Sequence, residues 1–135
     1  DALECFQRAH ELKPERFKAA YNGANALLRL GRYPQAIDCY RHAAEREPDN
    51  PAPWHSTGVA YARMGDLRGA YRAFRRALHL DPGYLASWAN LAGVCRELGF
   101  RRRALACATR AQQLAPGDER ITSLVRECRD ALQRQ

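Results

Sequence analysis

The stretch that decides the fold is WHSTGVAYARMGDLRGAYRAFRRALHLDP, residues 54–82. Trp54, Gly58 and Tyr61 are spaced four and three residues apart, which places them on one face of a helix. Gly65 then interrupts the pattern, because glycine takes the backbone conformation that a helix end requires. A second helical stripe follows, and it ends at a proline that cannot continue a helix. The stretch therefore predicts a helical hairpin.

The same pattern recurs every 34 residues, so that segments 17–50, 51–84 and 85–118 align with one another. The registers that recur hold a small residue (Ala24, Gly58, Ala92), a glycine (Gly31, Gly65, Gly99), two alanines (Ala36, Ala70, Ala104 and Ala43, Ala77, Ala111) and a proline (Pro48, Pro82, Pro116). Small residues allow two helices to approach to about 8–10 Å, and we expect the large Trp54, Tyr61 and Phe74 to fill the remaining space. We expect helices near 1–12, 17–30, 35–47, 52–64, 67–80, 85–98, 101–115 and 118–132.

The repeated residues resemble the tetratricopeptide repeat, including its period. The residues that carry the resemblance in the second copy are Trp54, Gly58, Tyr61, Ala70, Phe74, Ala77 and Pro82. The resemblance implies an all-α fold, a right-handed α-solenoid of antiparallel helical hairpins in which the first helix of each pair lines a concave groove. It divides a single domain into a truncated repeat, three full repeats and a capping helix, at 1–16, 17–50, 51–84, 85–118 and 119–135.

The last predicted helix differs from the repeats. Its apolar residues form one face (Ile121, Leu124, Val125, Cys128 and Leu132), and Asp118 precedes them as a candidate N-cap. An amphipathic helix after the last repeat is expected to cover the open end of a solenoid.

The positions of the first helices that the core does not use are free to contact a partner. They give the candidate partner-binding residues Tyr21, Asn22, Asn25, Arg29, His55, Ser56, Arg63, Asn90 and Arg96. Asn22, Ser56 and Asn90 share one register, which resembles the asparagine ladder in the superhelical arm of O-linked N-acetylglucosamine transferase. An amide both donates and accepts, so such a row can pair with a peptide backbone. The alternatives are a solvated polar groove and, for Tyr21, replacement of the bulk that is missing at Ala20.

A second use of this family is to clamp the acidic C-terminal tail of heat-shock chaperones. That clamp requires Lys, Asn, Asn, Lys and Arg at particular groove positions. The corresponding residues here are Tyr21, Asn25, Ser56, Ala86 and Asn90, of which only Asn25 matches. The sequence therefore argues against a chaperone tail as the ligand.

The net charge of +7 is concentrated between Arg63 and Arg110, a segment with ten arginines and three acidic residues. Such an excess favours an acidic protein or peptide partner through electrostatic steering. The alternative is a solvated outer face. No aromatic groove or nucleic-acid motif accompanies these arginines, so nucleic-acid binding is not expected.

No motif in the chain indicates catalysis. It lacks the phosphate-cradling loops, metalloprotease signatures and nucleophile elbows of common enzymes, so no catalytic residue, cofactor or metal site is predicted. The cysteines (Cys5, Cys39, Cys95, Cys107 and Cys128) are odd in number and lie in apolar stretches without a Cys-x-x-Cys pair. This favours a reducing, cytoplasmic location. No apolar run reaches the ~18 residues of a membrane span.

These observations predict a non-catalytic protein–protein interaction module, a fragment of a larger scaffold or adaptor protein, that binds a peptide or protein segment in its groove. The alternative is a substrate-presenting or regulatory arm of a larger enzyme such as a glycosyltransferase. A further alternative is self-association through the truncated N-terminal edge, where Leu3 and Phe6 would leave an apolar face open.

Overall fold

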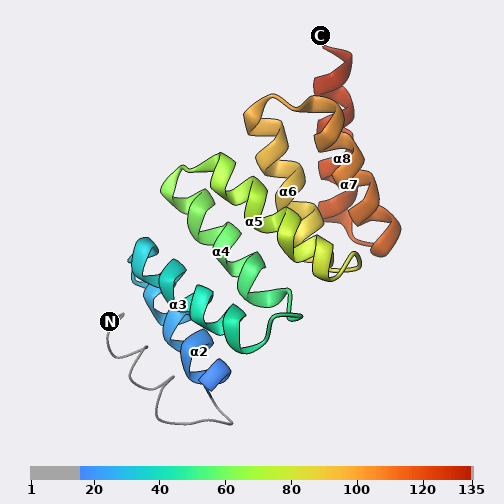
Figure 1. Ribbon diagram of the computed structural model, residues 1–135. Helices are drawn as coiled ribbons and strands as arrows, with labels where there is room; N and C mark the ends of the chain where they lie inside the picture. Colours follow the sequence, from blue (N-terminus) through green and yellow to red (C-terminus); the bar gives the residue numbers. More distant parts are fainter. Residues whose placement is uncertain (1–15, 135) are drawn as a thin grey trace.

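The computed structural model describes residues 16–134, and in that part of the chain it contains helices and no strands (Figure 1). The helices are α2 (Arg16–Arg29), α3 (Tyr33–Arg46), α4 (Ala52–Met64), α5 (Leu67–Leu80), α6 (Leu85–Leu98), α7 (Arg101–Leu114) and α8 (Glu119–Gln133). The helix expected at 1–12 and the apolar edge at Leu3 and Phe6 lie outside the described residues. None of the seven helices is both long enough and apolar enough to cross a membrane.

The helices pack as antiparallel hairpins, α2 with α3, α4 with α5 and α6 with α7, and each hairpin packs against the next. Figure 1 shows the hairpins side by side, from α2 at one end of the stack to α8 at the other. Successive first helices contact each other, α2 with α4 and α4 with α6, whereas the second helices α3, α5 and α7 do not. The stack therefore curves with the first helices on its inner side. This arrangement confirms the predicted all-α solenoid.

The turn inside each hairpin has the same backbone. Gly31, Gly65 and Gly99 have φ angles of +78°, +86° and +85°, in the left-handed region that favours glycine. At each turn the residue after the glycine donates its amide to the carbonyl five residues earlier, as Asp66 does to Tyr61 at 2.9 Å. This pair of features is the Schellman motif, which satisfies carbonyls that a helix end leaves without a partner.

The observed helix bounds agree closely with the predicted ones. The ranges 52–64, 67–80 and 85–98 are confirmed. Helix α7 ends one residue earlier than predicted, and α2 and α8 are each displaced by one residue at both ends. Helix α3 begins at Tyr33, two residues earlier than predicted, with Pro34 in its first turn. A proline is accepted there because the amides of the first turn have no intrahelical acceptor.

The buried side chains form two separate clusters. One lies between α2 and α3 around Tyr40, and the other extends from α5 to α8 around Phe74 and Leu91. The prediction that Trp54 and Tyr61 fill the core is only partly right, because both remain half-buried. Tyr61 packs at the edge of the second cluster and Trp54 belongs to neither.

The final helix α8 packs against α7 and also contacts α6. Ile121, Val125 and Cys128 are buried on its inner face. The side chain of Asp118 accepts a hydrogen bond from the Arg120 amide at 2.9 Å, which confirms Asp118 as the N-cap. The buried face of α8 thus covers apolar side chains of the last hairpin.

Candidate functional site

The predicted partner-binding residues all lie on α2, α4 and α6, the helices of the inner face. Asn22, Arg29, Arg63 and Asn90 are exposed to solvent. Their side chains are therefore available to a partner.

A depression of 350 Å³ lies between α4 and α6 on this face. Its apolar lining includes Val59, Val94 and the ring of Phe74, and its polar lining includes Arg63 and Asn90. Two of the predicted residues are thereby brought together, one from each helix. An apolar floor beside an amide and a guanidinium can hold a side chain of a peptide while hydrogen-bonding its backbone.

Gly93 also lines this depression, in the middle of α6. A Cβ atom built on Gly93 would meet no other heavy atom within 4 Å. The glycine therefore keeps the depression open, since any larger residue would project into it. Glu97 lines it as well and shares a register with Arg29 and Arg63, a signal by which the sequence could have identified it.

Tyr21 joins α2 to α4. Its ring stacks on Phe17 at a centroid distance of 5.4 Å and meets the ring of Tyr40 edge-on at 5.8 Å. Its hydroxyl lies 3.4 Å from the hydroxyl of Ser56, which is only 9% exposed. Tyr21 thus supplies packing bulk beside Ala20. The row of Asn22, Ser56 and Asn90 is interrupted in its middle by a buried hydroxyl.

Asn25 is oriented by a buried tyrosine. The hydroxyl of Tyr40 donates to Oδ1 of Asn25 at 2.5 Å. Burial raises the pKa of Tyr40 to about 12, so the hydroxyl keeps its proton at neutral pH. This bond uses the acceptor atom of Asn25 and leaves its amide N–H groups as the donors on that side chain.

His55 bridges α4 and α6. Its Nδ1 atom lies 2.8 Å from the hydroxyl of Ser87, which is fully buried. The ring lies 5.4 Å from that of Tyr84 and 5.3 Å from that of Phe74. Burial lowers the pKa of His55, so its neutral form is favoured. No signal in the sequence identified Ser87 as its partner, because the same register holds Ala19 and Pro53.

Arg96 contacts the terminal helix. Its guanidinium forms an ion pair with Glu127 of α8. Both side chains are exposed, and such pairs contribute only about 0–1 kcal/mol. Arg96 therefore marks the end of the inner face and can exchange its partner for an incoming carboxylate at little cost.

The described cysteines Cys39, Cys95, Cys107 and Cys128 are all buried. A hydrogen bond with Cys95, together with burial, raises the pKa of Cys107. Cys107 therefore stays protonated and packs as a small apolar residue. Within residues 16–134, no group of three or more His, Cys, Asp or Glu side chains could hold a metal ion.

The fold and this face define the chain as a helical-repeat solenoid. Family models match it over residues 24–65, as "TPR repeat", and over residues 61–128, as "Tetratricopeptide repeat". The chain belongs to the tetratricopeptide repeat family. No curated protein sequence matches it significantly.

Solved structures of the same fold cover most of the chain. The first TPR of Spaghetti (RPAP3), bound to the HSP90 peptide SRMEEVD, has a TM-score of 0.83 and 23% identity and covers 88% of this chain and 94% of its own. The Arabidopsis OM64 TPR domain has a TM-score of 0.80 and 16% identity, covering 88% and 98%. The second TPR domain of human RPAP3, in complex with the HSP70 peptide SGPTIEEVD, has a TM-score of 0.76 and 20% identity, covering 82% and 92%. At these identities the likeness concerns the fold.

Proposed function

We propose that this chain is a non-catalytic interaction module that binds a peptide segment of another protein along α2, α4 and α6. The observation that carries the proposal is the depression between α4 and α6, with its apolar floor and the side chains of Arg63 and Asn90 beside it. Two of the similar domains contain bound peptides, which supports a peptide as the class of ligand.

The ligand is an acidic segment other than a chaperone tail. Arg29, Arg63 and Arg96 are exposed on the inner helices, and this excess favours carboxylates. Four of the five clamp positions of the family hold residues of other types, and one of these four, Ser56, is buried beneath Tyr21. Because the side chains at these positions differ from those of the chaperone-tail clamp, we expect a peptide of a different sequence.

The test uses a variant that closes the depression and leaves the core intact. The added ring of Gly93→Phe has no neighbour to displace near its Cβ, so it should occupy the depression while α6 keeps its helicity. A random peptide library is selected on the parent protein and then on Gly93→Phe as the counter-target. Arg126→Ala, an exposed position on α8, serves as the control.

We expect peptides that bind the parent and Arg126→Ala but not Gly93→Phe. Amide shifts in NMR spectra should map these peptides to α4 and α6. Circular dichroism establishes that the variant is folded. If every enriched peptide binds Gly93→Phe as well as the parent, binding in this depression is ruled out.

A further inference from the structure

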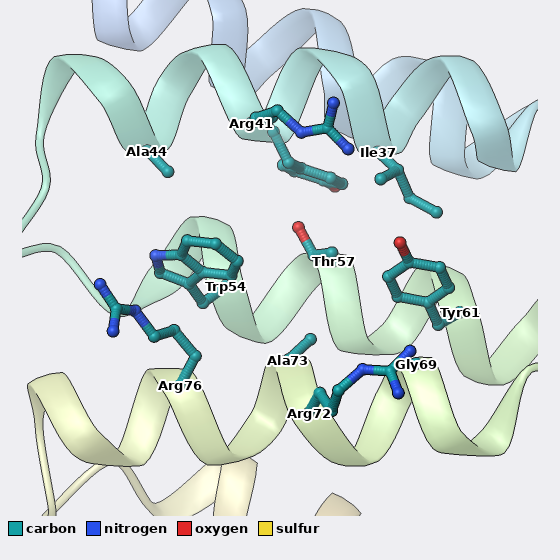
Figure 2. Close-up of a pocket in the computed structure, with 11 residues that line it drawn as sticks. Ile37, Arg41, Ala44, Trp54, Thr57, Tyr61, Gly69, Arg72, Ala73 and Arg76 are labelled. Atoms are coloured by element: carbon teal, nitrogen blue, oxygen red, sulfur yellow. The ribbon is translucent and has the colours of Figure 1, made fainter.

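A second pocket lies on the outer face of the solenoid, between α3 and α5, and α4 forms its floor. Its volume is 310 Å³, at the lower end of the roughly 300–1,000 Å³ of ligand sites. Figure 2 shows Trp54, Thr57 and Tyr61 extending from α4 between the two outer helices. This pocket is located where the two buried clusters of the fold fail to meet.

The next repeat has an equivalent depression with a different lining. The equivalent depression one repeat later, between α5 and α7, has Leu78 and Arg103 where the first has Ala44 and Gly69. There Arg103 donates to the hydroxyl of Tyr71 at 2.9 Å, so its side chain extends across the depression. The depression between α5 and α7 has a volume of 560 Å³, against 310 Å³ for the first pocket. At these two positions the first pocket has residues without a long side chain, so no side chain extends from them across its opening.

Gly69 also allows the ring of Tyr61, which lines the pocket, to lie close to α5. A Cβ atom at Gly69 would lie 2.8 Å from the ring of Tyr61 and 2.8 Å from a carboxylate oxygen of Asp66. The glycine therefore lets Tyr61 lie flat against α5 while one side of its ring remains available. The rings of Tyr61 and Trp54 give the pocket an aromatic surface that residues 16–134 leave partly exposed.

The charge around the pocket has one sign. Arg41, Arg72 and Arg76 line it, and no acidic residue does. The guanidinium of Arg76 lies 5.6 Å from the ring centre of Trp54. Arg41 has an exposed ion pair with Asp38 at 3.9 Å, and neither Arg72 nor Arg76 has an ion pair within the described part of the chain. An arginine guanidinium that has no carboxylate partner can form an ion pair with a carboxylate of another protein.

We propose that this outer pocket, which is separate from the inner groove, binds a peptide segment in which one large apolar side chain is flanked by carboxylates. The apolar side chain packs on Trp54 and Tyr61, where it removes their exposed surface from water. The carboxylates on either side pair with Arg72 and Arg76. The tetratricopeptide solenoid would thus carry ligands on both of its faces.

The probe is a fluorescein-labelled peptide, Gly-Ser-Glu-Asp-Leu-Glu-Asp-Ser-Gly. One comparison peptide carries Gln and Asn in place of Glu and Asp, and another carries Ser in place of Leu. We expect saturable binding of the first at concentrations below about 1 mM, and binding at least about tenfold weaker for both others. In NMR spectra the bound probe should shift the indole signal of Trp54 and the side-chain signals of Arg72 and Arg76.

The variants follow from the comparison between repeats. Ala44→Leu introduces the residue of the second depression and should weaken binding at least about tenfold by filling the pocket. The double variant Arg72→Gln/Arg76→Gln alters only exposed side chains and should weaken binding of the probe by the same factor. This second test does not depend on how Ala44→Leu affects stability. Arg68→Gln, an exposed position on the same helix outside the pocket, should leave the affinity within about twofold.

Gly93→Phe distinguishes this proposal from the proposed function, because closing the inner depression should leave binding of the acidic probe unchanged. Three outcomes would overturn the outer-pocket proposal. They are equal affinity for the neutral peptide, probe-induced shifts confined to the inner residues Asn90 and Val94, and displacement of the probe by single-stranded oligouridine at lower concentrations than by unlabelled peptide.

Discussion

Two helical glycines of this chain should respond in opposite ways to the same substitution. Gly58 in α4 and Gly93 in α6 both lie inside a helix with ordinary helical backbone. Alanine in place of glycine stabilises a helix interior by about 0.5–1 kcal/mol. This gain should apply equally to both positions, so any difference between the variants reports what surrounds the added methyl group.

The surroundings differ sharply. A Cβ at Gly93 would meet nothing within 4 Å, whereas a Cβ at Gly58 would lie 2.6 Å from Cε1 of the buried Phe74 ring. Overpacking of this kind costs about 1–3 kcal/mol. We therefore expect Gly93→Ala to raise the free energy of unfolding by about 0.5–1 kcal/mol. Gly58→Ala should lower it by up to about 2 kcal/mol once the helical gain is included.

Urea denaturation followed by far-UV circular dichroism measures both values, provided that the denaturant slope stays the same. The double variant Gly58→Ala/Phe74→Leu serves as the control. It should be less destabilised than the sum of its single variants, because the smaller side chain relieves the collision. An equal gain in stability for Gly58→Ala and Gly93→Ala would refute the close contact between α4 and the Phe74 ring.

Two further perturbations test other features of the fold. The free energy of unfolding should fall as the pH drops below about 6.5, because the unfolded chain takes up a proton that burial disfavours on folded His55. His55→Gln should lose this part of the pH dependence in urea titrations at several pH values. His79→Gln, at an exposed position, should keep it. Parallel pH profiles for the two variants would contradict the assignment of this pH dependence to His55. Asp66→Ala removes the side chain that accepts a hydrogen bond from the amide of Gly69 at 2.9 Å and caps α5. Thermal unfolding should report a loss of about 0.5–2 kcal/mol, and an unchanged midpoint would show that the cap contributes nothing.

The fold could be predicted from the sequence because its determinants recur. Small residues such as Ala70 and Ala77 appear at fixed spacing, are buried where predicted and set how closely the helices pack. Gly65 and its equivalents likewise predict every turn inside a hairpin, since a positive φ angle is required there. Each of these constraints acts over a few residues of one helix or turn, so a single sequence expresses it.

The sites were less predictable because they depend on contacts between repeats. Ser56 looked like a groove residue, but the replacement of tryptophan by Ala20 brings the adjacent Tyr21 over it. The lining of the outer pocket likewise combines two small residues, Ala44 and Gly69, that lie on different helices and face the same space. Neither residue is unusual in its own helix, so the pattern along the chain does not distinguish a pocket from a filled interface.

The matching turns at Gly31, Gly65 and Gly99 have a consequence for how proteins of this kind can change in length. Because each hairpin closes with the same backbone geometry, a whole unit can be excised or duplicated at equivalent points without redesigning a junction. Removing residues 66–99 would join Gly65 directly to Phe100 and keep one turn of the same geometry, and adding a copy would lengthen both faces of the solenoid together. Length is therefore a variable that evolution or an engineer can adjust independently of the chemistry on the surface.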